Sequence, residues 1–280
     1  MAGTLDGKAV IVTGAGRGLG RVMTLGLLDA GARVAAVELD PPALGELTRL
    51  AQQHGAGERL LDIAIDVTHD AAGPQIVRRA LERFGRLDVL VNNAGVNIGL
   101  LRGDGRAAKL WDVAPTEFRR IIEVNVVAAF LMTRAVLPSM LAQRSGRIIN
   151  VTTSLDTMWR GGMQPYGGSK AANEAHLLAF AQELEGTGVT ANVLVPGGAA
   201  NTRMVSETQS PDRSKLIAPE VMVPPLIWLC SNASDGVSGQ RFIGMRWDTK
   251  LPPGEAAKKA GAPAAWQQLG RQAIMPDSMR

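Results

Sequence analysis

Cysteine and histidine, the residues that form disulfides and most often bind metals, are scarce in this chain. It contains one cysteine, Cys230, and three histidines without ligand spacing, so we expect no internal disulfide and no bound metal. The apolar residues before Cys230 predict a buried, inert thiol. Aromatic residues make up only 4% of the chain, and no basic stripe is interleaved with them. This composition argues against nucleic acid as a partner.

Long hydrophobic runs are also missing. No stretch approaches the roughly 18 consecutive apolar residues of a membrane-spanning helix, and only residues 9–12 form an apolar run near the N-terminus. We therefore expect no membrane span, no signal peptide and a cytoplasmic protein. Most of the net charge of +4 comes from residue 246 onward, where six basic residues face three acidic ones. We interpret this excess charge as solvated rather than as a nucleic-acid site.

Short apolar runs rich in β-branched residues alternate with amphipathic stretches along the chain. The expected strands are 8–13, 32–37, 60–65, 88–91, 147–151, 189–195 and 240–244. The expected helices are 22–30, 43–54, 72–84, about 115–141, 166–185 and 219–230. This order is typical of a parallel sheet covered on both faces. We predict the α/β class, as one Rossmann-type doubly wound domain of about seven strands over residues 1–248.

The remaining residues, 249–280, form a C-terminal extension of different composition. It is rich in proline, glycine and alanine, but it also carries Trp266, Leu269, Ile274 and Met275. A disordered tail seldom carries such large apolar residues. We therefore expect the extension to dock, either over its own pocket or across an oligomer interface.

A glycine-rich loop joins the first expected strand to the first expected helix. Its sequence, residues 13–20, has the pattern Thr-Gly-x-x-x-Gly-x-Gly. Glycines at such a turn let a diphosphate approach backbone N–H groups at the positive end of a helix, where a Cβ would obstruct it. The candidate coenzyme contacts in the loop are Gly14, Arg17, Gly18, Leu19 and Gly20.

The second expected strand ends at Glu38, which stands 18 residues beyond Gly20. Dinucleotide-binding folds place an acid near this position, where it accepts hydrogen bonds from the adenosine ribose. A carboxylate there repels a 2′-phosphate, so Glu38 favours NAD. Arg17 in the glycine loop favours NADP instead.

Tyr166 and Lys170 stand four residues apart at the start of a helical pattern, so both side chains leave one face of its first turn. An ammonium beside a phenol stabilises the phenolate and lowers the tyrosine pKa from about 10. Such a tyrosine can exchange a proton with an alcohol oxygen. Tyr166 is the only tyrosine in the chain, and it follows the hydroxyl cluster 152–154 at the end of a strand. The combination predicts an active site.

Amides and small residues mark two further positions. Asn93, Ala94 and Gly95 follow the fourth expected strand, at the edge where open α/β sheets bind ligands. Asn125 stands in an apolar helical run, where its amide needs partners. It is either a satisfied core polar group or part of a proton path.

Taken together, these residues resemble the short-chain dehydrogenase/reductase family over about residues 8–247. The matching motifs are the glycine loop 13–20, Asn-Asn-Ala-Gly at 92–95 and Tyr-x-x-x-Lys at 166–170. The resemblance implies that Asp66 and Val67 border the adenine and that Asn125 holds a proton-relaying water. It implies that Pro196, Gly197 and Thr202 hold the nicotinamide amide. It also implies a homotetramer or homodimer packed through the helices that begin near residues 115 and 166.

The catalytic hydroxyl departs from the family pattern. Counting three residues past Asn150, or 13 residues before Tyr166, places the family's serine at Thr153, and a serine occurs only at position 154. We predict that Thr153 is the working hydroxyl, with Ser154 as the alternative. The spacing from Gly197 to Thr202 is also one residue longer than is usual in the family.

We therefore predict an NAD(H)-dependent oxidoreductase that interconverts a secondary alcohol and a ketone. The alternatives are an NADPH-dependent ketone reductase and a catalytically weak nucleotide-binding regulator. A sugar-nucleotide epimerase is disfavoured, because few residues remain after Pro196 for a substrate domain. The expected substrate rim comprises Leu100, Leu101, Asp156, Met158, Trp159, Arg160, Met163, Met204 and Trp247.

Overall fold

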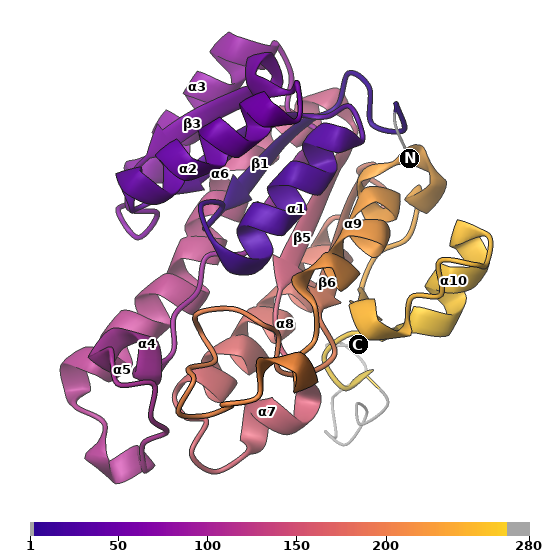
Figure 1. The fold of residues 1–280 in the computed structure, drawn as a ribbon. Coiled ribbons are helices and arrows are strands. Elements are labelled where there is room, and N and C mark those ends of the chain that lie inside the picture. The colour runs from indigo at the N-terminus through magenta and orange to yellow at the C-terminus, as the bar shows by residue number, and fades with distance from the viewer. Residues whose placement is uncertain (1–2, 268–280) are drawn as a thin grey trace.

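A computed structural model describes residues 3–267 of the chain. Eight strands form one sheet in the order β3-β2-β1-β4-β5-β6-β7-β8, and the first seven in sequence are parallel (Figure 1). The strands are β1 Ala9–Thr13, β2 Arg33–Glu38, β3 Leu60–Ala64, β4 Val89–Asn92, β5 Gly146–Val151, β6 Val189–Val195, β7 Gln240–Ile243 and β8 Gly261–Pro263. The central strands are almost entirely buried, as their continuous apolar runs predict.

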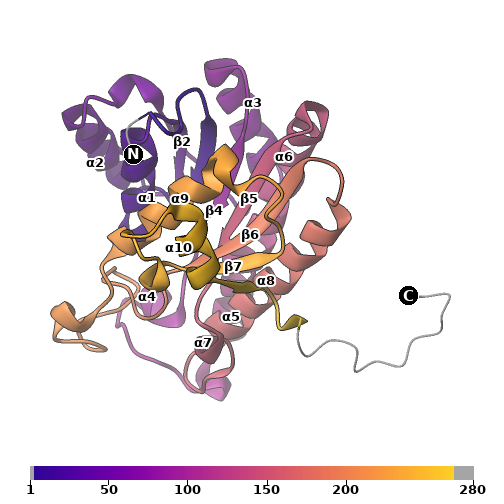
Figure 2. The same ribbon diagram turned by 90° about the vertical axis from the view of Figure 1, so that its right-hand side faces the viewer.

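Helices cover both faces of the sheet (Figures 1 and 2). They are α1 Gly18–Asp29, α2 Pro41–Gln53, α3 Ala72–Phe84, α4 Ile98–Arg102, α5 Pro115–Ile122, α6 Ala128–Gln143, α7 Leu155–Trp159, α8 Tyr166–Glu183, α9 Val223–Cys230 and α10 Pro253–Ala260. One apolar core lies between the sheet and α1, α2 and α9. A second lies between the sheet and α3, α6 and α8. The predicted doubly wound α/β domain is confirmed.

The strand order reverses between β1 and β4, which are adjacent in the sheet although α1, β2, α2, β3 and α3 separate them in sequence. Chains leave the carboxyl ends of β1 and β4 in opposite directions at such a point, and a crevice opens between them. The glycine loop after β1 and the segment after β4 border this crevice. The short helices α4 and α7 lie beyond the same edge of the sheet (Figure 1).

The extension adds elements that the sequence did not predict. After a short turn it forms α10, then β8, which pairs antiparallel with β7 and becomes the eighth strand. Ala264 behind β8 is fully buried. Residues up to 267 therefore lie at the β7 edge of the sheet (Figure 2). The large apolar residues Leu269, Ile274 and Met275 lie outside the described residues.

One helical stretch of the described residues bears on the expectation that the chain has no membrane span. The continuous helical stretch Pro115–Gln143 is long and apolar enough by length and composition, because its polar residues are spread out rather than absent. A core helix of a soluble protein has the same length and composition. Here the stretch packs against α3, α8 and the sheet, as a layer of the fold.

Candidate active site

The glycine loop is packed so tightly that it tolerates no side chain at two positions. A Cβ on Gly20 would lie 2.0 Å from the Gly14 carbonyl oxygen, and a Cβ on Gly14 would lie 2.9 Å from the Ala94 Cα. The Asn93 amide donates hydrogen bonds of 3.0 Å to the carbonyl oxygens of Thr13 and Gly14. Asn93 thus fixes the loop after β1 to the end of β4.

The helix behind this loop leaves its positive end open. Within the described chain, no side chain caps α1, and its first turn, at Gly18, Leu19 and Gly20, carries no acid. Helix N-termini of this kind bind phosphate groups through free N–H donors. Thr202 lies against the same loop, because a Cβ on Gly18 would be 3.1 Å from the Thr202 methyl carbon. The loop and the open helix end therefore fit a diphosphate.

Glu38 lies at the end of β2, directly beside the glycine loop. Its Oε2 accepts a 3.1 Å hydrogen bond from the Gly16 N–H, and its Oε1 accepts bonds of 2.9 and 3.3 Å from the N–H groups of Leu39 and Asp40. Arg17 forms an ion pair with Asp40, and this contact holds the pKa of the Asp40 carboxyl below its usual value. Arg17, which would contact the 2′-phosphate of NADP, is therefore already paired with the Asp40 carboxylate.

Asp66 follows the end of β3, and both of its carboxylate oxygens accept hydrogen bonds from other residues of the chain. Its Oδ2 accepts a 3.0 Å bond from Arg120 on α5, and its Oδ1 accepts bonds from the N–H and hydroxyl of Thr68. The adjacent Val67 is buried against the β3 side of the sheet. The place of Asp66 and Val67 beside an adenine stays a prediction.

Tyr166 begins α8, and its phenol meets the loop that follows β5. The Tyr166 phenol interacts with the side chain of Thr153. Burial raises the pKa of Tyr166 to about 12, and the interaction with Thr153 opposes this shift. The Ser154 hydroxyl lies 2.7 Å from the Thr157 hydroxyl instead. Of the two candidate hydroxyls, the structure places Thr153 against the tyrosine.

Lys170 lies one turn further along α8, buried behind the tyrosine. Its Nζ donates a 2.9 Å bond to the Val151 carbonyl and lies 6.0 Å from the centroid of the Tyr166 ring. Burial lowers the pKa of Lys170 to about 8. The expected depression of the Tyr166 pKa is therefore not found, because burial disfavours the charged form of both Tyr166 and Lys170.

Asn125 lies in a π-helical turn, Glu123–Val127, that joins α5 to α6. Its amide exchanges two bonds with the Val96 backbone and donates a third to Ser169, while its backbone carbonyl accepts a 2.7 Å bond from Asn173. Asn125 is thus a satisfied core amide rather than a group with a free donor for water. A Cβ on Gly95 would lie 3.2 Å from the Lys170 Nζ and 3.3 Å from the Asn125 Oδ1, so Gly95 lets these groups approach.

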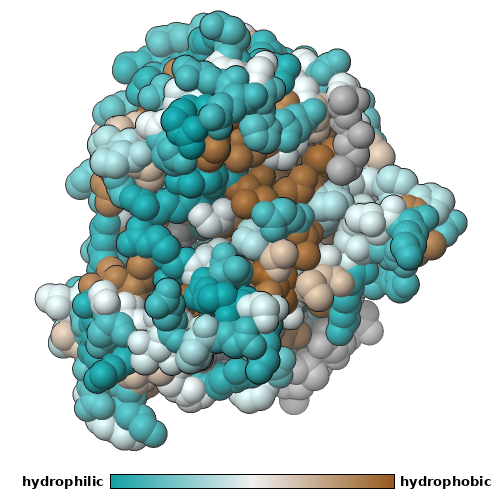
Figure 3. All heavy atoms as spheres, viewed as in Figure 1, coloured by the Kyte–Doolittle hydropathy of each residue, from teal (hydrophilic) through white to brown (hydrophobic). Residues whose placement is uncertain are grey.

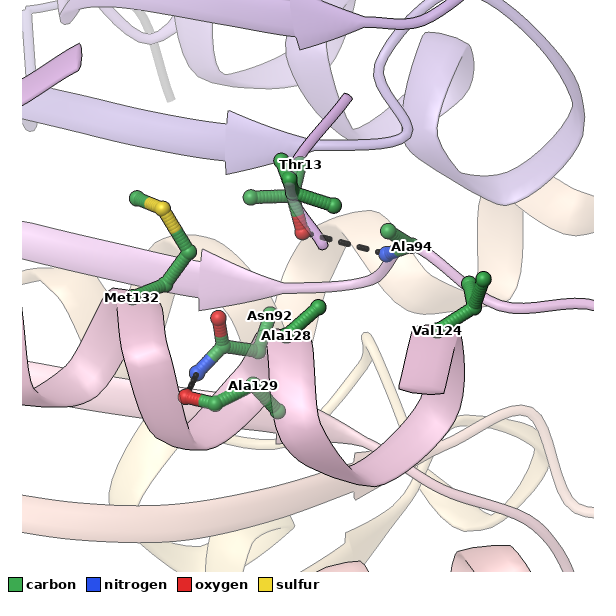
Figure 4. A pocket seen from close by; sticks show the side chains of 8 residues that line it. Thr13, Asn92, Ala94, Val124, Ala128, Ala129 and Met132 are labelled. Atoms are coloured by element: carbon green, nitrogen blue, oxygen red, sulfur yellow. Dashed lines mark hydrogen bonds between the residues drawn. The ribbon is translucent and has the colours of Figure 1, made fainter. Parts of the chain in front are cut away.

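Three further buried amides, from Asn92, Asn150 and Asn173, form a chain of hydrogen bonds that ends at Asn125. Asn92 donates to Asn150, Asn150 donates to Asn173, and Asn173 donates to the Asn125 carbonyl. Among the described residues the Oδ1 of Asn92 has no partner, and its side chain lies in a small recess between β4 and α6 (Figure 4). The sequence did not predict these contacts of Asn150 and Asn173, because the amides that bond them are distant in the sequence.

The segment after β6 completes the crevice. Gly197 has a φ of 106°, and the Pro196 carbonyl accepts a 3.0 Å bond from the Met245 N–H. Residues 198–203 then cross to the glycine loop, where Thr202 meets Gly18. Of the three expected nicotinamide contacts, Thr202 thus meets the coenzyme loop, while Pro196 and Gly197 lie beside Met245, which follows β7.

The residues of the expected substrate rim do not all lie together in the structure. Trp159 and Leu101 are exposed near the site edge, and Met158 is buried in α7. Trp247 packs 5.7 Å from Trp228, measured between ring centroids, in the core under α1 and α9. Trp247 therefore lies apart from the other rim candidates. Figure 3 shows that apolar side chains reach the surface in the central hollow of this face.

Comparison with known proteins agrees with this geometry. A family model described as short chain dehydrogenase matches residues 8–213. The chain belongs to the short-chain dehydrogenase family. It is an NAD(P)-dependent oxidoreductase of the kind that acts on CH–OH and keto groups, and the sequence-based recognition of the family is confirmed.

Three members of the short-chain dehydrogenase family show the extent of the likeness. A short chain dehydrogenase of Pseudocercospora fijiensis is 36% identical over 75% of this chain, which spans 64% of that relative. Fluoren-9-ol dehydrogenase of Terrabacter is 30% identical over 95% of this chain and 76% of the relative. The structure of a 3-ketoacyl-(acyl-carrier-protein) reductase from Brucella melitensis complexed with NADH is 28% identical. The match covers 84% of this chain and 95% of the Brucella chain, with a TM-score of 0.74.

Proposed function

We propose that the chain is an NAD(H)-dependent oxidoreductase that interconverts a secondary alcohol and a ketone. The observation that carries this proposal is the contact between Tyr166 and Thr153, one helical turn from Lys170 and beside an open coenzyme loop. The phenol and the threonine hydroxyl together can hold one reacting oxygen, and the phenol can give it a proton or take one from it.

The protein groups supply binding and proton transfer, while a nicotinamide would supply or accept the hydride. In ketone reduction, protonated Tyr166 donates its proton to the carbonyl oxygen as the hydride reaches the carbon. In alcohol oxidation the same phenol oxygen takes the proton back. Thr153 orients the reacting oxygen, and Lys170 favours the phenolate whenever its amine is protonated. Lys170 would also hold the ribose of a nicotinamide nucleotide.

We infer a preference for NAD from Glu38. Its carboxylate is held at the mouth of the glycine loop by three N–H groups, so it stays where an adenosine ribose would bind. A 2′-phosphate at this place would meet a fixed negative charge. The Brucella reductase, which is 28% identical, forms a complex with NADH, and this supports the same choice.

NADP is the second candidate, because cations lie close to this site. Arg17 pairs with Asp40, and Arg203 also lowers the pKa of Asp40. Opening the Arg17–Asp40 pair would free a guanidinium for a 2′-phosphate.

The cofactor proposal is tested by comparing kcat/KM for the two nucleotides. The unmodified enzyme should favour NAD(H), and Glu38→Ser with Asp40→Asn should shift the preference toward NADP(H) by roughly 10- to 100-fold, since one charged contact contributes about 1.5–3 kcal/mol. Asp70→Asn, on the exposed surface away from the loop, is the control. Equal efficiency with both nucleotides in the unmodified enzyme would contradict the proposal.

The substrate class rests on the relatives and on the apolar rim. The Terrabacter protein is named for fluoren-9-ol, an alcohol, and the Brucella protein for a 3-ketoacyl group. We therefore propose a small apolar alcohol or ketone as substrate, and a cytoplasmic enzyme. A regulator that binds nucleotide without turnover is the rival, and a screen of alcohols and ketones followed at the nicotinamide absorbance separates the two.

We also propose a homodimer or homotetramer. Val127, Phe130 and Leu141 are exposed apolar residues along the helical stretch through α6, and Phe130 stacks on Phe180 of α8. An exposed apolar face of this kind is typical of subunit contacts. The mass of the enzyme in solution tests this proposal.

A further inference from the structure

A buried ion pair lies beneath the loop that carries Thr153. Glu174 of α8 is fully buried, and Arg241 of β7 is 5% exposed. Arg241 Nε donates a 3.0 Å bond to Glu174 Oε1, and its Nη2 lies 3.3 Å from Oε2. Neither residue belongs to the coenzyme motif or to the catalytic motif. A buried pair is weak evidence for stability, because well-packed apolar residues often serve as well.

This pair holds the loop after β5 from two sides. Arg241 Nη2 donates a 2.7 Å bond to the Thr153 carbonyl, and the Thr152 hydroxyl donates a 2.8 Å bond to Glu174 Oε2. The strand itself ends at Val151, so the sheet ladder no longer fixes Thr153. The ion pair thus contacts the backbone of the residue whose hydroxyl meets Tyr166.

The C-terminal extension reaches the same pair. The N–H of Ala265 donates a 3.2 Å bond to Glu174 Oε1, and Ala262 of β8 pairs with Arg241. Ala265 and Trp266 both have a φ of 53°, a conformation that residues other than glycine adopt at a cost. Such a conformation persists where the surroundings hold it in place, here with the Ala265 N–H directed at the carboxylate.

We propose that Arg241 and Glu174 are positioning residues that set the Thr153 hydroxyl against Tyr166, and that the extension holds them through Ala265. The proposal rests on the proposed function, in which Thr153 holds the reacting oxygen. A continuous path of contacts supports it: Ala265 to Glu174, Glu174 to Arg241, Arg241 to the Thr153 backbone, and Thr153 to the phenol. Loss of the path should displace the hydroxyl while the coenzyme loop stays intact.

The test uses the single tyrosine of the chain. Tyrosine labelled with carbon-13 at Cζ gives one resonance, whose position reports the hydrogen bond of the Tyr166 phenol. Thr153→Val defines the position of this resonance without that bond. The test variant combines Arg241→Met with Glu174→Leu, so that neither charge is left buried and unpaired. Arg147→Met is the matched control, because Arg147 is a largely buried arginine at the other end of β5, paired with Asp235.

The double variant should move the resonance toward its position in Thr153→Val and lower kcat at least tenfold, with nucleotide affinity unchanged. Arg147→Met should leave the resonance in place. A folded double variant with the parent resonance would overturn the proposal. If the double variant does not fold, Arg241→Lys gives the same comparison, since it keeps a cation beside Glu174 but lacks the second donor arm toward Thr153.

The role of the extension is tested in the full chain by Ala265→Pro, which breaks the contact with Glu174 in two ways. It removes the N–H that bonds the carboxylate, and because proline cannot adopt the φ of 53° found at Ala265, it also forces the backbone out of its present conformation. The resonance should move in the same direction, and an unchanged resonance would remove the extension from the proposal. The resonance needs no substrate, so it tests positioning even if no alcohol or ketone is turned over. Failure of the proposed function would show up separately, as an inactive parent enzyme.

Discussion

At the scale of single residues, the site depends on which hydroxyl faces the phenol. Counting along the sequence placed the hydroxyl at Thr153, and the structure joins Thr153 to Tyr166 and Ser154 to Thr157. Thr153→Ala should therefore lower kcat by about 10- to 1000-fold, as expected when one donor to the reacting oxygen is lost. Ser154→Ala is the matched control and should change kcat less than about threefold. If Ser154→Ala lowers kcat strongly and Thr153→Ala does not, the assignment of Thr153 as the working hydroxyl is wrong.

The protonation of Tyr166 is a second expectation at this scale. Burial raises its pKa to about 12, so the free enzyme holds the phenol protonated near neutral pH. Alcohol oxidation needs the phenolate, so its rate should rise with pH, while ketone reduction uses the protonated phenol and should fall only as the phenolate forms. Tyrosinate absorbance after a rapid pH jump should show a midpoint near 12, and Tyr166→Phe should abolish it. A midpoint near the ordinary value of about 10 would refute the burial argument.

At the scale of elements, the sequence predicted what depends on local pattern. All seven parallel strands and the main helices follow from apolar runs and helical periods, and the glycine loop follows from its spacing. The π-helical turn at Asn125, the short helices α4 and α7, and the strand β8 were not predicted. Each depends on contacts with distant parts of the chain: β8, for example, forms because β7 offers a free edge.

The buried polar partners could not be predicted for the same reason. In the sequence Asn173 and Glu174 resemble ordinary positions of a helix, and Arg241 resembles a polar residue in a strand. Asn173 bonds Asn150, which is 23 residues away in the sequence, and Arg241 bonds Thr153, which is 88 residues away. Only the folded sheet brings them together. Sequence motifs therefore predicted the reacting groups, but not the buried groups that contact them.

The glycine loop gives the prediction for this scale. Gly20→Ala would place a Cβ 2.0 Å from the Gly14 carbonyl oxygen and 2.6 Å from the Asn93 amide, so the loop must shift. Nucleotide affinity, measured by NADH fluorescence titration, should fall by about tenfold or more, because the backbone donors lose their alignment. Gly45→Ala on α2 is the control: it meets open space and should stabilise the fold by roughly 0.5–1 kcal/mol. Unchanged affinity in Gly20→Ala would exclude this loop as the diphosphate site.

At the scale of the whole molecule, the middle of the sheet and its β7–β8 edge serve different purposes. The crevice lies at the carboxyl ends of β1 and β4, where the strand order reverses, and α8 brings Tyr166 and Lys170 to the same edge. The extension covers the β7 side of the sheet and contacts the Thr153 loop through Glu174 and Arg241. The loop that follows β5 thus links the Thr153 hydroxyl to the extension, while the coenzyme loop is held separately by Asn93 at the end of β4.

The most direct test of the proposed function is hydride transfer itself. NADH carrying deuterium at the reactive carbon should be mixed with each ketone of the screen, and the alcohol produced should be analysed by mass spectrometry. We expect deuterium on the carbinol carbon of the product, and no product with Tyr166→Phe although that variant still binds NADH. Tight NADH binding by the unmodified enzyme with no deuterium transferred to any ketone would contradict the proposal.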